Sequence, residues 1–195
     1  MGAPLPAAHL PAQRPRDMGR RPGRVRMGRR RIQRLERTQR LRAPAERAFE
    51  FYAEARNLEA ITPPWLGFRM ITQGTIEMRA GALIDYRLKL HGVPVRWRTR
   101  IEVWEPPLRF IDVQLRGPYS LWEHTHTFER DGDDAVLITD RVRYALPLGP
   151  LGGIAHAIFV RRDHERIFNY RAMAVAARLA TTAPDLAVDN HHSMH

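Results

Sequence analysis

The sequence contains no cysteine among its 195 residues. This absence excludes disulfide bonds, thiolate catalysis and cysteine-based zinc sites, and it is typical of a cytoplasmic protein. No apolar run approaches the roughly 18–20 residues that a membrane-spanning helix needs. The first residues also lack the continuous apolar segment of a signal peptide. No glycine-rich phosphate loop is visible, so nucleotide binding through such a loop is not expected.

Acidic residues are almost missing from the first 31 positions. These positions hold nine arginines and a single aspartate, Asp17, so eight of the eleven net positive charges of the chain fall there. Proline and glycine are frequent and no apolar period is present, which predicts a disordered basic arm over residues 1–30. Residues 182–195 are expected to form a flexible polar tail. One domain over residues 31–181 remains between them.

The arm and the tail leave two interpretations open. Residues 14–31 can make a weak electrostatic contact with nucleic acid or anionic lipid, or they can be a solvated extension. No aromatic residue is interleaved with the arginines, so the sequence gives no firm nucleic-acid partner. In the tail, His191, His192 and His195 can bind a metal loosely or form part of a flexible end.

Hydrophobic periodicity predicts an α+β domain. Strand patterns joined by turns indicate an antiparallel meander, which must curve and can hold a long helix across its concave face. The expected order begins with a strand at 32–42, a helix at 45–55 and a second short helix capped by Asn57 and reaching Ile61. A strand at 68–71 follows, which can continue at 76–78 after a turn at Gly74. The order ends with strands at 83–91, 95–104, 109–116, 119–130 and 135–146 and a long helix at 154–180.

The strand at 119–130 carries the most informative pattern. Because side chains alternate along a strand, Trp122, His124, His126 and Phe128 share one side, and their aromatic character predicts that this side is buried. Buried imidazoles need partners. Those partners are either other side chains, such as Asp140 on the last strand, or a bound molecule.

Besides simple hydrogen bonding, His124 and His126 can have two chemical roles. Two imidazoles at positions i and i+2 can bind a metal if Asp140 or His164 supplies the third protein ligand. Imidazoles also suit acid–base catalysis near neutrality. No nucleophile–base–orienter set is visible, so His124 and His126 are only candidate catalytic residues. We expect no metal and no cofactor.

The sequence alone does not decide which side of the strand at 109–116 points to the concave face of the sheet. Asp112 and Gln114 share one side, and they contact a ligand if that side is concave. They are solvated surface if it is convex. The apolar residues Ile111, Val113 and Leu115 favour the second arrangement, because they compete for the inward side.

Several blocks along residues 32–180 carry a family resemblance. They are Tyr86-Arg87-Leu88, Gly92-Val93-Pro94, Trp97-Arg98, Phe110 to Gln114, Gly117-Pro118-Tyr119, Trp122-x-His124-x-His126-x-Phe128, Thr139-Asp140-x-Val142-x-Tyr144, Leu146-Pro147-x-Gly149-x-Leu151-Gly152 and Ile167-Phe168-x-Tyr170-Arg171. In these blocks the sequence resembles the SRPBCC superfamily (START-like, Bet v 1-like), and within it the bacterial ligand-binding or polyketide cyclase/dehydrase-like group. His164 departs from the aliphatic residue expected there.

The resemblance implies a helix-grip fold. In this fold a curved antiparallel sheet of about seven strands wraps around a long C-terminal helix, with two short helices after the first strand. A hydrophobic cavity lies between sheet and helix, which fits the large and partly polar side chains of this chain. The expected ligand-binding residues are Tyr86, Trp97, Gln114, Trp122, His124, His126, Phe128, Tyr144, His164 and Phe168.

Three functions follow from these expectations. The first is non-enzymatic binding of a small hydrophobic or amphipathic molecule, such as a lipid, a polyketide or an isoprenoid-like compound. The second is a polyketide cyclase/dehydratase-like enzyme with a histidine acid/base, which rests on analogy of fold. The third is nucleic-acid or protein interaction through the basic arm.

Overall fold

The computed structural model describes residues 32–147 and 160–181. The predictions for the arm, for the turn-rich connection 147–153 beyond its first residue, for the first part of the long helix and for the tail with its three histidines lie outside the described residues.

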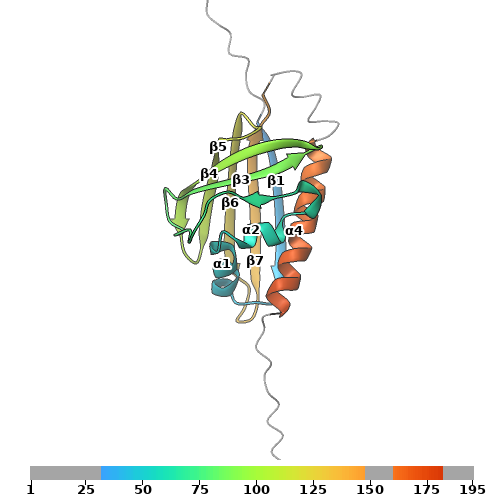
Figure 1. Ribbon diagram of the computed structural model, residues 1–195. Coiled ribbons are helices and arrows are strands. Elements are labelled where there is room, and N and C mark those ends of the chain that lie inside the picture. The colour runs from blue at the N-terminus through green and yellow to red at the C-terminus, as the bar shows by residue number, and fades with distance from the viewer. Residues whose placement is uncertain (1–31, 148–159, 182–195) are drawn as a thin grey trace, which may run out of the picture.

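One antiparallel sheet forms the body of the protein (Figure 1). Its seven strands stand in the order β1-β7-β6-β5-β4-β3-β2, so the meander runs in sequence from β2 to β7 and the first strand pairs with the last. This is the expected α+β arrangement. The strands are β1 Gln33–Leu41, β2 Arg69–Met70, β3 Leu83–Leu90, β4 Val93–Glu105, β5 Arg109–Arg116, β6 Leu121–Arg130 and β7 Val136–Ala145.

The sheet bends around α4 (Arg161–Thr181), which runs along its concave side (Figure 1). The pairing of β4 with β5 shifts register between Arg98 and Thr99 and again between Ile101 and Val103. Such bulges bend a strand and increase its twist, so they help the 13-residue β4 to cross over the concave face.

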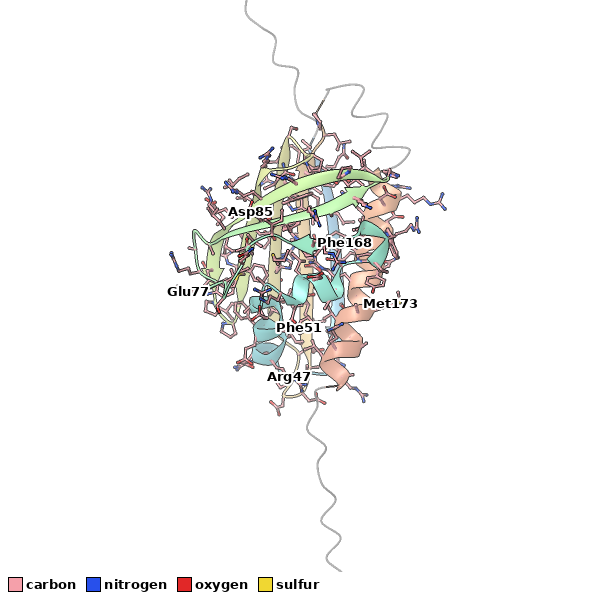
Figure 2. The ribbon with its side chains drawn as sticks, viewed as in Figure 1. Arg47, Phe51, Glu77, Asp85, Phe168 and Met173 are labelled. Atoms are coloured by element: carbon pink, nitrogen blue, oxygen red, sulfur yellow. The ribbon has the colours of Figure 1, made fainter. Side chains whose placement is uncertain are left out.

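The helix α4 contacts the sheet through one stripe of side chains. His164, Phe168, Val175 and Leu179 are buried and follow the 3.6-residue period. Figure 2 shows Phe168 on the side of α4 toward the sheet and Met173, which is 66% exposed, on the other side. The predicted long helix therefore buries one stripe of side chains in its described part, with His164 at one of the stripe's positions.

Two short helices follow β1, as expected. The helix α1 (Ala45–Ala53) packs Ala48 and Phe49 against β6 and β7. The helix α2 (Asn57–Ile61) contacts α4. Asn57 does not cap it: Asn57 is its first residue, and its side-chain amide donates to the carbonyl of Phe51 at 2.8 Å. A turn of 3-10 helix, η1 (Pro64–Leu66), was not predicted.

The predicted strand at 76–78 is wrong, because strand pairing ends early. The backbone N–H groups of Ile71 and Thr72 both donate to the carbonyl of Asp85, at 2.8 and 3.1 Å. The hydroxyl of Thr72 then accepts from the backbone N–H of Asp85 at 2.8 Å. This side chain takes the place of a strand partner, so β2 is confined to Arg69–Met70. Ile76 and Met78 instead pack on the main core cluster.

The main core lies at the α1 end of the sheet. Phe49 packs edge-on against Phe110 and Phe128, and Val175 of α4 belongs to the same cluster. Two smaller clusters, around Trp97 and around Tyr144, lie toward the other end. Within residues 32–147 and 160–181, no helix combines the length and apolar character needed to cross a bilayer.

Candidate functional site

Strand register brings four polar side chains together on the concave face. His126 on β6 pairs with Phe110 of β5 on one side and with Asp140 of β7 on the other. Two residues along β6, His124 pairs with Asp112 of β5. Directly paired residues point to the same face of an antiparallel sheet. Asp112 therefore faces inward, and the open question about β5 is settled in favour of the concave side.

The two imidazoles lie between the two carboxylates. Toward Asp140, His124 Nε2 donates to Oδ1 at 3.0 Å, and His126 Nδ1 lies 2.7 Å from the same oxygen without the angle of a hydrogen bond. Toward Asp112, the distances to Oδ2 are 3.3 Å from His126 Nε2 and 3.6 Å from His124 Nδ1. The predicted pairing of a buried histidine with Asp140 is confirmed, and Asp112 is an additional partner.

Packing fixes the orientation of both rings. The His126 ring stacks on Phe110 at 4.2 Å between centroids, and it lies tilted by 40° against the His124 ring at 3.8 Å. His124 also lies edge-on to Phe168 of α4. Each histidine is only 3% exposed. Neither ring can turn without displacing an aromatic neighbour, so the positions of the four ring nitrogens are set by the fold.

The shared partners separate the proton affinities of the two histidines. Burial lowers the pKa of His124, and repulsion from His126 lowers it further. Burial also opposes charge on His126, but its contacts with Asp112 and Asp140 outweigh that effect and raise its pKa. Burial opposes charge on Asp140 as well, yet the two imidazoles hold the pKa of that carboxyl well below its usual range.

A cavity of about 170 Å³ lies between the sheet and α4. Its wall is mostly apolar, with Ile84, Leu88, Ile101, Ile167 and Phe168 among the lining side chains. Asp112, His124 and His126 form a polar patch in this wall, whereas Asp140 does not line the cavity. The exposed residue Glu54, at the end of α1, is also part of the lining. The cavity therefore reaches the surface near α1 and α2.

Other polar groups line the cavity away from the histidine pair. Tyr119 Oη and His164 Nε2 lie 2.8 Å apart and join the β5–β6 turn to α4. Tyr86 Oη lies 3.4 Å from Thr99 Oγ1 across β3 and β4. Trp97 Nε1 is buried and has no hydrogen-bond partner among the described residues. A buried donor without a partner costs free energy, which a ligand acceptor can offset.

Seven of the ten predicted ligand-binding residues line the cavity, namely Tyr86, Trp97, Trp122, His124, His126, His164 and Phe168. Three do not. Phe128 is 2% exposed and packs into the main core against Phe49 and Tyr52. Tyr144 packs behind His164, with ring centroids 4.6 Å apart. Gln114 turns back to the chain: its amide donates to the Tyr119 carbonyl at 2.7 Å and its oxygen accepts from the Tyr119 N–H at 3.3 Å.

The lining also includes residues that the sequence reasoning did not assign to the site, chiefly Asp112, Tyr119, Arg171 and Tyr52. Arg171 lies three residues after Phe168 and seven after His164, so the helical period places it near the buried stripe. For Asp112 the available signal was its pairing register with His124, which requires knowing where the β5–β6 turn lies. Tyr52 lies in α1, where the sequence predicts a helix but does not indicate that this side chain reaches the cavity.

The comparisons with known proteins bear on the fold. Neither protein-family models nor curated proteins match this sequence. Solved structures do match in fold. The Zhui aromatase/cyclase from Streptomyces sp. R1128 is 14% identical with a TM-score of 0.63, covering 77% of this chain and 94% of its own.

A START superfamily protein from Mycobacterium smegmatis is 13% identical with a TM-score of 0.57, covering 77% of this chain and 99% of its own. Norcoclaurine synthase from Thalictrum flavum, in complex with dopamine and hydroxybenzaldehyde, is 13% identical with a TM-score of 0.60 and covers 79% and 90%. At such low identity the likeness shows the fold and does not carry over an activity. The chain has the SRPBCC, or Bet v 1-like, helix-grip fold that the sequence resemblance implied.

Proposed function

We propose that this protein binds a small hydrophobic or amphipathic molecule in the cavity between the sheet and α4. The observation that carries the proposal is an apolar cavity of about 170 Å³ with one polar patch in its wall. Ligand sites typically combine apolar lining with a few polar groups that orient the guest. Here the polar end of the molecule would lie against Asp112, His124 and His126, and its apolar part against α4.

The size of the cavity narrows the class of ligand. A protein cavity of roughly 150 Å³ can hold a benzene ring. The space here therefore fits one ring with a short polar substituent, and a longer chain would have to extend past Glu54 to the surface. The structural neighbour norcoclaurine synthase is in complex with dopamine and hydroxybenzaldehyde, which are molecules of this size. Phenolic aldehydes are thus suitable first probes.

Saturation-transfer NMR with 4-hydroxybenzaldehyde and a panel of short fatty acids tests the proposal. Leu58 lines the cavity, so Leu58→Trp should fill part of it and abolish the transfer signal. Leu115 is 48% exposed and does not line the cavity, so Leu115→Trp makes the same chemical change and should leave the signal intact. Native mass spectrometry of the chain purified from its own host would identify a natural guest. No signal with any probe and no co-purified molecule would overturn the proposal, as would unchanged binding in Leu58→Trp.

A second function, cyclase/dehydratase-like catalysis, is supported by the imidazole–carboxylate cluster in the cavity wall. An imidazole beside a carbonyl compound can take a proton from the carbon next to the carbonyl, and the resulting carbanion can attack a second carbonyl of the same molecule. This attack forms the carbon–carbon bond that closes the ring, and the imidazolium returns its proton to the new alkoxide. The imidazole then takes a proton from the adjacent carbon, and the hydroxyl group leaves with that proton as water to form a double bond. A poly-β-ketone thioester incubated with the protein should lose water in the wild type and not in His126→Gln. A carrier would bind the compound and return it unchanged.

A further inference from the structure

The four polar residues on β5, β6 and β7 are arranged asymmetrically. Behind the cavity wall, both imidazoles approach one oxygen of Asp140 closely, at 2.7 and 3.0 Å. In the wall itself, the other nitrogen of each ring faces one oxygen of Asp112 at 3.3 and 3.6 Å. Charged hydrogen bonds between nitrogen and carboxylate oxygen are usually about 2.7–2.9 Å long. One rear contact has that length and the other is slightly longer. Both front contacts are longer still, and of the two only the contact of His126 is a hydrogen bond.

The front gap has the dimensions of a metal site. One ligand atom from each of Asp112, His124 and His126 lies within 4.8 Å of the others. Ligands bound tetrahedrally at about 2.0–2.1 Å from an ion lie roughly 3.3–3.4 Å apart. The observed 3.3 and 3.6 Å to Asp112 Oδ2 bracket that spacing closely. The two imidazole nitrogens lie within 4.8 Å of one another, so they would move closer together to hold an ion between the three groups.

The rear contacts match what a metal-binding histidine requires. A ligating imidazole must carry its proton on the nitrogen away from the metal, and it almost always presents that N–H to a carboxylate or carbonyl. Asp140 accepts a hydrogen bond from His124 Nε2, which leaves the lone pair of His124 Nδ1 directed toward Asp112. His126 Nδ1 lies 2.7 Å from the same Asp140 oxygen, whereas His126 Nε2 forms a hydrogen bond with Asp112 Oδ2 at 3.3 Å. An ion at the front would take the place of the proton in this hydrogen bond, and it would also relieve the repulsion between the His124 Nδ1 lone pair and the Asp112 oxygen.

From these contacts we infer that Asp112, His124 and His126 form a binding site for a divalent transition-metal ion of the zinc class, with Asp140 as the positioning residue behind it. Two nitrogen ligands and one oxygen ligand suit such an ion. The sequence had suggested Asp140 or His164 as the third ligand, but Asp140 lies behind the rings and the Nε2 of His164 contacts Tyr119. Because all three ligands line the cavity, an open coordination position would face its interior.

The test uses the full chain with His191, His192 and His195 changed to asparagine, so that the terminal histidines contribute no zinc binding. After treatment with EDTA and dialysis, titration with Zn²⁺ alone in a calorimeter should give one site per chain. In this background, Asp112→Asn should weaken Zn²⁺ binding at least ~100-fold because it removes a charged ligand. Asp140→Asn should weaken it roughly 10–100-fold, the range typical of a partner behind a ligand.

A surface histidine supplies the matched control. His91 Nε2 lies 2.6 Å from Asp163 but is 62% exposed and outside the cluster, so His91→Gln should leave the Zn²⁺ affinity unchanged. Circular dichroism melting in EDTA must show the same cooperative unfolding in Asp112→Asn as in the parent. If that variant does not fold, the zinc K-edge absorption spectrum of the zinc-loaded parent identifies the ligands instead. Two imidazole nitrogens and at least one oxygen at about 2.0–2.1 Å from the zinc support the site.

Two results would overturn the inference. One is the absence of stoichiometric Zn²⁺ binding to the parent with substituted terminal histidines. The other is a Zn²⁺ affinity that is the same in the parent and in a folded Asp112→Asn variant. Neither result would affect the proposed binding of an apolar guest, because probe binding in the cavity is measured without metal.

Discussion

Asp140 is the single residue on which the geometry of the histidine pair depends most. It is 9% exposed, and it is the carboxylate that both imidazoles approach most closely. Removing one partner of a buried ion pair leaves the other charge uncompensated and costs about 3–5 kcal/mol. We expect Asp140→Asn to lower the free energy of unfolding in urea by about that amount.

An exposed ion pair gives the comparison for this prediction. Asp131 pairs with Arg40 on the surface at 2.5 Å, with both side chains at least 40% exposed. Asp131→Asn makes the same chemical change and should cost only about 0–1 kcal/mol. Equal losses of stability in the two variants would mean that burial of the Asp140 cluster contributes nothing special to folding.

Because tyrosine phenols are buried in this protein, we expect its free energy of unfolding to fall at high pH. Burial raises the pKa of both Tyr86 and Tyr119 above the ordinary value for tyrosine. The folded state therefore favours the neutral phenol, so this contribution to stability is complete below a pH of about 10 and is lost as the pH rises through the higher folded-state pKa. The urea midpoint should fall above pH ~10.

A spectroscopic titration checks the same point directly. In the native chain, near-ultraviolet absorbance should show fewer tyrosinates at pH ~10.5 than in guanidinium-unfolded chain, out of five tyrosines in total. Tyr86→Phe should reduce the alkaline loss of stability. If all five phenols ionise together near pH ~10 in the native chain, these rings are not protected from water as the structure has them.

Residue-level prediction from sequence succeeded where alternation and chemistry agreed. The side of β6 that carries His124, His126 and Phe128 combines aromatic and apolar neighbours, so its burial could be deduced from the order of residues. Asp112 could not be placed in the same way, because Ile111 and Val113 on the opposite side of β5 are also apolar. Its inward direction is decided by pairing with His124 across two strands, and single-sequence periodicity does not contain that register.

At the scale of elements, the turn between β5 and β6 depends on the close approach of the Gln114 side chain to Gly117. A Cβ added at Gly117 would lie 2.3 Å from Oε1 of Gln114, the side chain that holds the backbone of Tyr119 through two hydrogen bonds. In Gly117→Ala the glutamine must move and both bonds are lost. At roughly 0.5–1.5 kcal/mol for each bond, we expect a loss of about 1–3 kcal/mol in unfolding free energy.

A double-mutant cycle isolates the cause of that loss. Once Gln114→Ala has removed the obstructing side chain, the further change Gly117→Ala should cost close to nothing, so the two substitutions should be strongly non-additive. Additive losses would show that Gly117 is needed for its backbone rather than for room beside Gln114. The two hydrogen bonds to the Tyr119 backbone explain why Gln114, predicted as a ligand contact, lies outside the cavity lining.

Prediction of the elements from sequence was accurate for type and weaker for ends. Alternation with a period of two residues identified β3 to β7, and the 3.6-residue period identified the long helix. In each of these elements a buried face repeats over many residues. Residues 76–78 also alternate, yet the hydroxyl of Thr72 replaces the strand partner and ends the pairing before them. A single side chain outweighed the periodic signal in that segment, and Ile76 and Met78 pack on the core without strand pairing.

At the scale of the whole molecule, charge is distributed unevenly between the folded part and the arm. Residues 1–31 hold eight of the eleven net positive charges. In the sheet, several arginines are matched by neighbouring carboxylates, as in the ion pairs of Arg98 with Asp85 and of Arg143 with Glu123. The folded part therefore presents mixed charge, and any attraction to an anionic surface should come mainly from the arm.

We expect the full chain to co-sediment with vesicles of phosphatidylcholine and phosphatidylserine at low salt and to be released at about 0.5 M salt, because screening removes such attraction beyond a few ångströms. A chain that starts at Ile32 should lose most of this binding while keeping the same melting temperature. Changing the nine arginines of the arm to lysine should preserve binding, and changing them to glutamine should abolish it, since the attraction depends on charge and not on the guanidinium.

Duplex DNA in place of vesicles tests the nucleic-acid alternative with the same variants. If the chain from Ile32 binds either surface as well as the full chain does, the basic arm is not the cause of that binding, and the arginines on the sheet must supply it despite their paired carboxylates.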